Sequence, residues 1–191
     1  MNEIEAIATA FEAPPGWADK LYEFVDGKFV VPTPMGVFEN SIANKLFAAI
    51  QRHFEQTVPS GWLFFETLFL IIRNPKRQRR PDVAYVSFDR WPSDRAIPET
   101  AAWDVVPDLA VEVVSPGNTA IEILVKLDDY FRAGVRRVWI IYPKQQIVQD
   151  YTSQTRVEFL GIDDTLKGGD VVPGFSITLA KLFNAKAKTA L

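Results

Sequence analysis

The chain has 191 residues, a net charge of −3 at pH 7, one histidine and no cysteine. Its length favours a single domain, and its content of 48% hydrophobic and 24% charged residues is typical of a globular protein rather than of a disordered chain or a coiled coil. The absence of cysteine excludes disulfides, thiolate zinc sites and cysteine nucleophiles, and a single histidine, His53, excludes a multi-histidine metal site.

We predict a partly ordered leader over residues 1–19 and one domain over residues 20–191. The leader has no basic region ahead of an apolar run, so it does not fit a signal peptide. The longest apolar run, Leu68–Ile72, is too short to cross a bilayer. We therefore expect a cytoplasmic protein that does not contact membranes.

The first half of the domain predicts a hairpin, a long helix and three strands. Alternating segments flank Asp26-Gly27, a strong hairpin signal, within residues 22–31. Apolar residues recur at helical spacing from about Glu39 to Glu55. The remaining segments are aromatic and β-branched strands at 62–65, 67–73 and 83–86, and a surface loop rich in proline and charge at 91–103.

The second half predicts a βαβ unit. An apolar strand over 109–114 is followed by a helix over about 119–133, which Gly134 closes, and by a second strand over 135–142. The two strands should be parallel, with a right-handed crossover. A meander at 147–151 and 156–160 and a short helix near 179–183 complete a mixed α/β domain.

Glu112 is the one charged residue in the apolar strand 109–114. An ionised carboxylate in a buried strand costs several kcal/mol unless it is paired, hydrogen-bonded or bound to a cation. Strand alternation places it on the same face as Ala110 and Val114. The alternative, which this residue alone leaves open, is a strand-end glutamate that reaches solvent or an arginine.

Asp82 and Lys126 are further candidates, although each has an ordinary structural interpretation. Asp82 opens a predicted strand, where solvated capping aspartates are common, and Lys126 follows Glu122 at the spacing of a surface ion pair. However, the crossover helix packs over the strand that carries Glu112, so Lys126 can lean toward that carboxylate. Asp82 and Glu112 would then bind one Mg²⁺ or Mn²⁺ through oxygen atoms, and Lys126 would orient or help to deprotonate the attacking water in phosphodiester hydrolysis.

A basic stretch comes directly before Asp82. A nuclease could use it to hold a nucleic-acid backbone, and a solvated basic loop is the alternative interpretation. The stretch contains Arg73, Lys76, Arg77, Arg79 and Arg80.

Six segments carry a resemblance to a known family. They are residues 22–30, 80–86, 107–116, 126–135, 138–143 and 169–175. In their order and spacing, over residues 20–184, they resemble the Uma-type family of proposed restriction endonucleases, within the PD-(D/E)XK nuclease superfamily. This resemblance implies a restriction-endonuclease-like core, a mixed central sheet flanked by helices, with an N-terminal hairpin and a C-terminal meander.

The resemblance also implies roles for individual residues. Asp82 and Glu112 match the metal-binding carboxylates, and the carbonyl of Val113 is the implied backbone ligand. The usual lysine position, two residues after the glutamate, is Val114 in this chain. Similar proteins carry the lysine on the following helix, where Lys126 matches it.

The start of the first helix departs from the family pattern. Similar sequences often have Glu-His there, whereas this chain has Glu39-Asn40. Glu39 is still implied as an auxiliary carboxylate near the metal or its water. Asn40 removes a group that could titrate near neutral pH, and His53 lies too far along the apolar stripe of the helix to replace it.

We therefore predict a Mg²⁺- or Mn²⁺-dependent endonuclease that acts on DNA. Its 14 phenylalanines and 5 tryptophans also suggest an aromatic surface for a homodimer. The alternative is a module that kept the nuclease fold, lost catalysis and binds nucleic acid or protein. Asn40 and the acidic net charge favour the alternative, whereas Asp82, Glu112 and Lys126 favour the enzyme.

Overall fold

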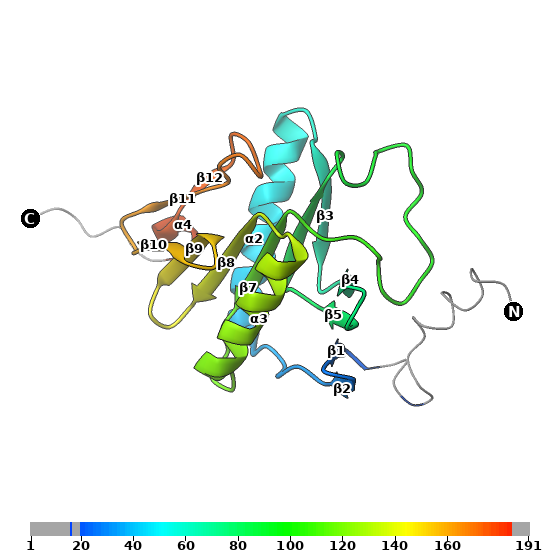
Figure 1. Ribbon diagram of the computed structural model, residues 1–191. Coiled ribbons are helices and arrows are strands. Elements are labelled where there is room, and N and C mark those ends of the chain that lie inside the picture. Colours follow the sequence, from blue (N-terminus) through cyan, green and yellow to red (C-terminus); the bar gives the residue numbers. More distant parts are fainter. Residues whose placement is uncertain (1–15, 17–19, 185–191) are drawn as a thin grey trace, which may run out of the picture.

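A six-stranded sheet forms the centre of the fold, with one long helix on each face (Figure 1). The computed structural model describes residue 16 and residues 20–184, so the predicted leader lies outside the described residues except for Gly16. In space the strands follow the order β10-β9-β8-β7-β6-β3. Their bounds are β3 Gly61–Phe65, β6 Val83–Ser87, β7 Leu109–Val113, β8 Arg137–Tyr142, β9 Ile147–Ser153 and β10 Arg156–Leu160.

The predicted βαβ unit lies at the middle of this sheet. β7 and β8 are parallel, and every other neighbouring pair in the sheet is antiparallel. They are joined by α3 (Ala120–Ala133), which begins at a capping box between Thr119 and Glu122. Gly134 ends the helix in the left-handed conformation, with φ of 95°, which glycine adopts without steric cost.

The two faces of β7 pack against different helices. Leu109, Val111 and Val113 belong to the core that also contains the buried residues of α2 (Val37–Gln56). Ala110 belongs to the core shared with α3, so Glu112 also faces α3. Strand alternation thus fixes the side of the sheet on which the site can form.

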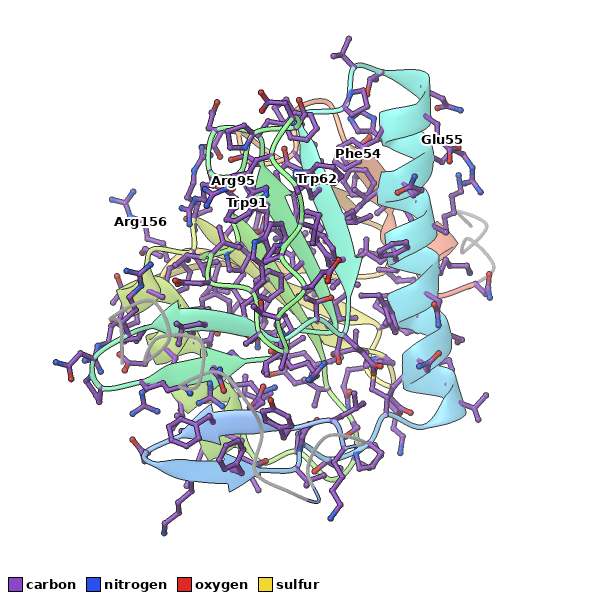
Figure 2. The ribbon with its side chains drawn as sticks, turned by 90° about the vertical axis from the view of Figure 1, so that its right-hand side faces the viewer. Phe54, Glu55, Trp62, Trp91, Arg95 and Arg156 are labelled. Carbon is purple, nitrogen blue, oxygen red and sulfur yellow. The ribbon has the colours of Figure 1, made fainter. Side chains whose placement is uncertain are left out.

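The apolar face of α2 covers the other side of the sheet. Figure 2 shows Phe54 of α2 pointing toward the sheet and Glu55 pointing away from it. This division follows the helical spacing of apolar residues in the sequence.

A second sheet, with the order β2-β1-β5-β4, lies beside the first (Figure 1). The predicted hairpin is confirmed, because β1 and β2 pair on either side of Asp26-Gly27. β5 was not predicted, since its residues Arg-Gln-Arg have no apolar period. The bounds are β1 Glu23–Val25, β2 Lys28–Val30, β4 Phe69–Ile72 and β5 Arg77–Arg79.

The C-terminal part extends the main sheet and then adds a small one. The predicted meander is confirmed as β9 and β10, and the short final helix as α4 (Leu179–Leu182). A two-stranded sheet of β11 (Thr165–Lys167) and β12 (Ser176–Thr178) was not predicted, because its short strands are not joined by a tight turn such as the one that signals the β1–β2 hairpin.

The segment 91–103 contains no helix or strand, as predicted for a loop. It is anchored at both ends, because Trp91 and Trp103 are buried and their rings pack edge to face. Arg95 lies over the ring of Trp91, at 3.7 Å from its centroid (Figure 2). Within residues 20–184, none of the helices has the length and apolar character needed to cross a membrane.

The packing of α2 on the sheet can be tested by substitution of Leu46. It is fully buried, so Leu46→Ala should lower the free energy of unfolding by about 2–5 kcal/mol. The control Val37→Ala lies in the exposed first turn of the same helix and should change it by less than about 0.5 kcal/mol. Urea denaturation checks both, and equal effects would contradict this packing.

Candidate active site

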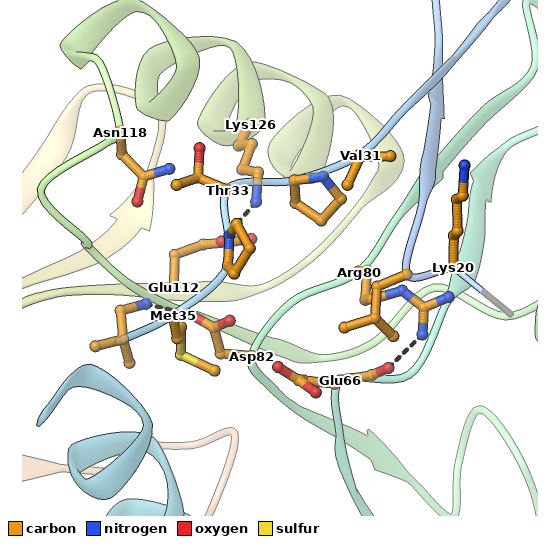
Figure 3. Close-up of a pocket in the computed structure, with 14 residues that line it drawn as sticks. Lys20, Val31, Thr33, Met35, Glu66, Arg80, Asp82, Glu112, Asn118 and Lys126 are labelled. Carbon is orange, nitrogen blue, oxygen red and sulfur yellow. Dashed lines mark hydrogen bonds and ion pairs between the residues drawn. The ribbon is translucent and has the colours of Figure 1, made fainter. Parts of the chain in front are cut away.

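A cavity of about 290 Å³ opens where the two sheets, α3 and the segment after β2 meet (Figure 3). It brings together five of the predicted site residues: Arg80, Asp82, Glu112, Val113 and Lys126. Figure 3 shows Lys126 and Glu112 pointing toward each other, with Asp82 beside them. The other lining residues are Lys20, Leu21, Val31, Pro32, Thr33, Pro34, Met35, Glu66 and Asn118.

Glu112 is buried and both of its carboxylate oxygens accept hydrogen bonds from α3. The Nζ of Lys126 donates to Oε2 at 2.7 Å, and the hydroxyl of Tyr130 donates to Oε1 at 2.5 Å. Lys126 and Tyr130 are four residues apart, so they lie on the same face of the helix. The predicted contact between the crossover helix and Glu112 is therefore confirmed.

Asp82 lies next to Glu112 because of the register of β6 and β7. These strands are antiparallel with Val83 opposite Val111, and one further step along the ladder pairs positions 82 and 112. The backbone N–H of Val113 donates to Oδ2 of Asp82 at 2.6 Å. Two carboxylates, one directly before β6 and one on β7, thus lie side by side in the cavity lining.

The two carboxylates lie next to each other, with the amine of Lys126 as their neighbouring positive charge. Burial, together with the nearby charge of Glu112, raises the pKa of Asp82 to about 8. Burial also raises the pKa of Glu112, although Lys126 opposes this shift. Burial alone would lower the pKa of Lys126, but the carboxylates of Glu112 and Glu23 raise it above its ordinary value, so its amine stays protonated.

The residues present fit a divalent cation with oxygen ligands. Asp82 and Glu112 are hard oxygen donors, and a cation would relieve the repulsion between the two carboxylates. Within residues 20–184, no three His, Asp or Glu side chains group closely enough to hold an ion by themselves. Backbone oxygen and water would therefore complete the ligand set, and Val113 lines the same cavity.

The other helix residues of the prediction lie outside this cavity lining. Glu39 is buried in the first turn of α2, four residues after Met35, which precedes the helix and lines the cavity. Asn40 accepts a hydrogen bond from the side chain of Asn44 within the same helix. The ring of His53 packs against Phe175, and its Nε2 lies 2.9 Å from the carbonyl of Pro173, far from the candidate site in the fold.

The basic stretch does not form one solvated loop. Arg73 is exposed and pairs with Asp104, and Lys76 lies over the ring of Phe24. Arg77 pairs with Asp26, at 2.5 Å, and with Asp129, at 3.1 Å. The stretch is thus largely committed to contacts within the domain.

Arg79 and Arg80 are adjacent in sequence but differ in position. Arg79 is buried between Glu23, at 2.7 Å, and Asp129, at 2.5 Å, so its guanidinium is already paired with two carboxylates. We therefore leave Arg79 out of the proposed nucleic-acid interface. Arg80 lines the cavity and donates to the backbone carbonyl of Glu66 at 2.5 Å (Figure 3).

Sequence reasoning missed three residues close to the site. Tyr130 carries a local signal, since it follows Lys126 by four residues on a helix. Glu23 and Glu66 carry none, because their positions depend on how the second sheet meets the first. Glu66 lies between β3 and β4 at φ of 46°, and its carboxylate faces the cavity (Figure 3).

A family model described as "Uma2: Putative restriction endonuclease" matches residues 11–180. The chain belongs to this family. Its fold is similar to the crystal structure of a "putative nuclease belonging to DUF820" from Anabaena variabilis ATCC 29413, with a TM-score of 0.71 and 20% identity over 86% of this chain and 90% of that chain. This likeness confirms the predicted nuclease fold. A comparison with curated proteins finds no match.

The buried ion pairs beside the site can be tested by substitution of Asp129. Asp129→Ala leaves the buried charge of Arg79 partly unpaired and should lower the free energy of unfolding by about 3–5 kcal/mol. The neighbouring Asp128 pairs with Arg132 at the surface, so Asp128→Ala should cost about 1 kcal/mol or less. Denaturant unfolding of both variants compares them directly, and a larger loss for Asp128→Ala would contradict this assignment.

Proposed function

We propose that this protein is a Mg²⁺- or Mn²⁺-dependent endonuclease that hydrolyses phosphodiester bonds in DNA. The convergence of Asp82, Glu112 and Lys126 in the lining of one cavity carries this proposal. Membership of a restriction-endonuclease family supports it. Hydrolysis of a phosphodiester needs an activated water and positive charge near the developing oxyanion, and these residue types provide for both.

Asp82, Glu112 and the carbonyl of Val113 would hold the cation. When bound, a divalent cation polarises the phosphate and lowers the pKa of a water molecule. The carboxylate of Asp82 is held in place for this role by the N–H of Val113, and that of Glu112 by Tyr130. Both ligands are thus oriented before a cation arrives, which reduces the cost of binding it.

Lys126 provides a fixed positive charge beside the reacting phosphate. Its amine is protonated and close to Glu112, so it can orient the attacking water and stabilise the charge that develops on phosphate oxygen. Arg80, on the wall of the same cavity, would contact the phosphate backbone. The exposed Arg73 lines a separate hollow with Asp104 and Arg132, so we do not assign it to this contact.

Glu39 and a homodimer complete the proposed enzyme. Glu39 would act as an auxiliary carboxylate from the first turn of α2, four residues after the cavity-lining Met35. We also propose that the protein is cytoplasmic and forms a homodimer. A single site would cut one strand, so two copies would be needed to cut both strands of a duplex. Light scattering in solution tests the dimer directly.

Neutral isosteres test the two carboxylates. Asp82→Asn and Glu112→Gln keep the shape of each side chain but remove its charge, so nicking of plasmid DNA with Mg²⁺ or Mn²⁺ should fall by about 100-fold or more. The control Glu158→Gln removes a charge from the exposed strand β10 and should leave the rate unchanged. Thermal unfolding should show that Asp82→Asn is not less stable than the wild type, because the raised pKa of Asp82 means that the folded state disfavours its ionised carboxylate.

Two results of this assay would contradict the proposal. Equal nicking by wild type and variants would point to a contaminating nuclease. Binding of DNA with no nicking in Mg²⁺ or Mn²⁺ would favour the catalytically inactive module, for which the Asn40 position is the supporting observation.

A further inference from the structure

Glu23 places a third carboxylate beside Lys126, from a strand of the second sheet. It is buried on β1, and its Oε1 lies 3.4 Å from the Nζ of Lys126. The same Nζ lies 2.7 Å from Oε2 of Glu112. The lysine is therefore shared between a candidate metal ligand, Glu112, and a carboxylate that does not line the main cavity.

The carboxylate of Glu23 is held by groups from two directions. Its Oε2 accepts from the guanidinium of Arg79 at 2.7 Å, and its Oε1 accepts from the backbone N–H of Arg80 at 3.0 Å. Arg79 in turn pairs with Asp129, which lies three residues after Lys126 on α3. A closed chain of contacts thus fixes Glu23 relative to the helix that carries the lysine.

The charges explain why a second carboxylate is needed. The Nζ of Lys126 has two ion-pair partners in the described structure, Glu112 and Glu23. If Glu112 also holds a divalent cation, its negative charge is shared, and Glu23 is the carboxylate that still balances the lysine. Without Glu23, the lysine and the cation would compete for Glu112.

We propose that Glu23 is a positioning residue, which holds Lys126 beside the cavity and thereby leaves Glu112 available to a divalent cation. This inference rests on the proposed metal-dependent function. Glu23 acts through Lys126 and touches neither substrate nor cation. Arg79 and Asp129 keep the Glu23 carboxylate in place, so the buried ion pairs of the second sheet serve the site.

Calorimetric titration with Mn²⁺, in the absence of DNA, tests this role. Glu23→Gln should weaken Mn²⁺ binding by about 10- to 100-fold, because the lysine then competes with Mn²⁺ for Glu112. In a Lys126→Met background the competitor is absent, so adding Glu23→Gln should cause no further loss. Asp26→Asn removes an exposed carboxylate from the same hairpin and should leave the affinity unchanged.

A second variant guards against a folding defect in Glu23→Gln. Glu23→Asp keeps a charge beside Arg79 but draws the carboxylate back from Lys126, so it should lower the affinity in the same direction. Equal Mn²⁺ affinities for the wild type and both Glu23 variants would overturn the proposed role of Glu23 and leave the proposed function standing. An equal loss in the Lys126→Met background would also overturn it, since Glu23 would then act independently of the lysine. No Mn²⁺ binding by the wild type would instead overturn the proposed function.

Discussion

The ion pair between Lys126 and Glu112 joins the central strand of the main sheet to the helix that crosses over it. A carboxylate at this depth is tolerated only with hydrogen-bonding and charged partners, and α3 supplies both through Lys126 and Tyr130. The helix that connects parallel β7 and β8 packs on the face of the sheet that carries Ala110 and Glu112, which places these partners against Glu112. The same contact that makes the strand stable therefore assembles the candidate site.

The small second sheet helps to position the residues of the candidate site. Its strands β1 and β5 bring Glu23 and Arg79 against α3, where they pair with Lys126 and Asp129. Such buried pairs add little net stability, because desolvation offsets much of their attraction, but removing one partner is costly. This asymmetry makes the network well suited to fixing a lysine in one position. Arg80, directly after β5, then reaches the cavity itself.

The βαβ unit and the hairpin could be predicted because their signals are local: apolar periods, Asp26-Gly27 and the closing Gly134. The contact of Lys126 with Glu112 could be predicted because the connecting helix of a βαβ unit packs back over its strands. β5 could not be predicted, since a charged three-residue strand depends on its pairing with β1 and β4. The position of Glu23 could not be predicted either, because its partner Arg79 is distant in sequence and no periodicity links the two residues.

A crystal structure with Mn²⁺ tests the central claim most directly, namely that Asp82 and Glu112 form one cation site. Anomalous scattering locates manganese independently of the atomic interpretation. We predict a single peak bound by oxygens of Asp82, Glu112 and the carbonyl of Val113, with Lys126 still in contact with Glu23. No peak between the two carboxylates at saturating Mn²⁺, or carboxylates that turn away from each other, would contradict the claim.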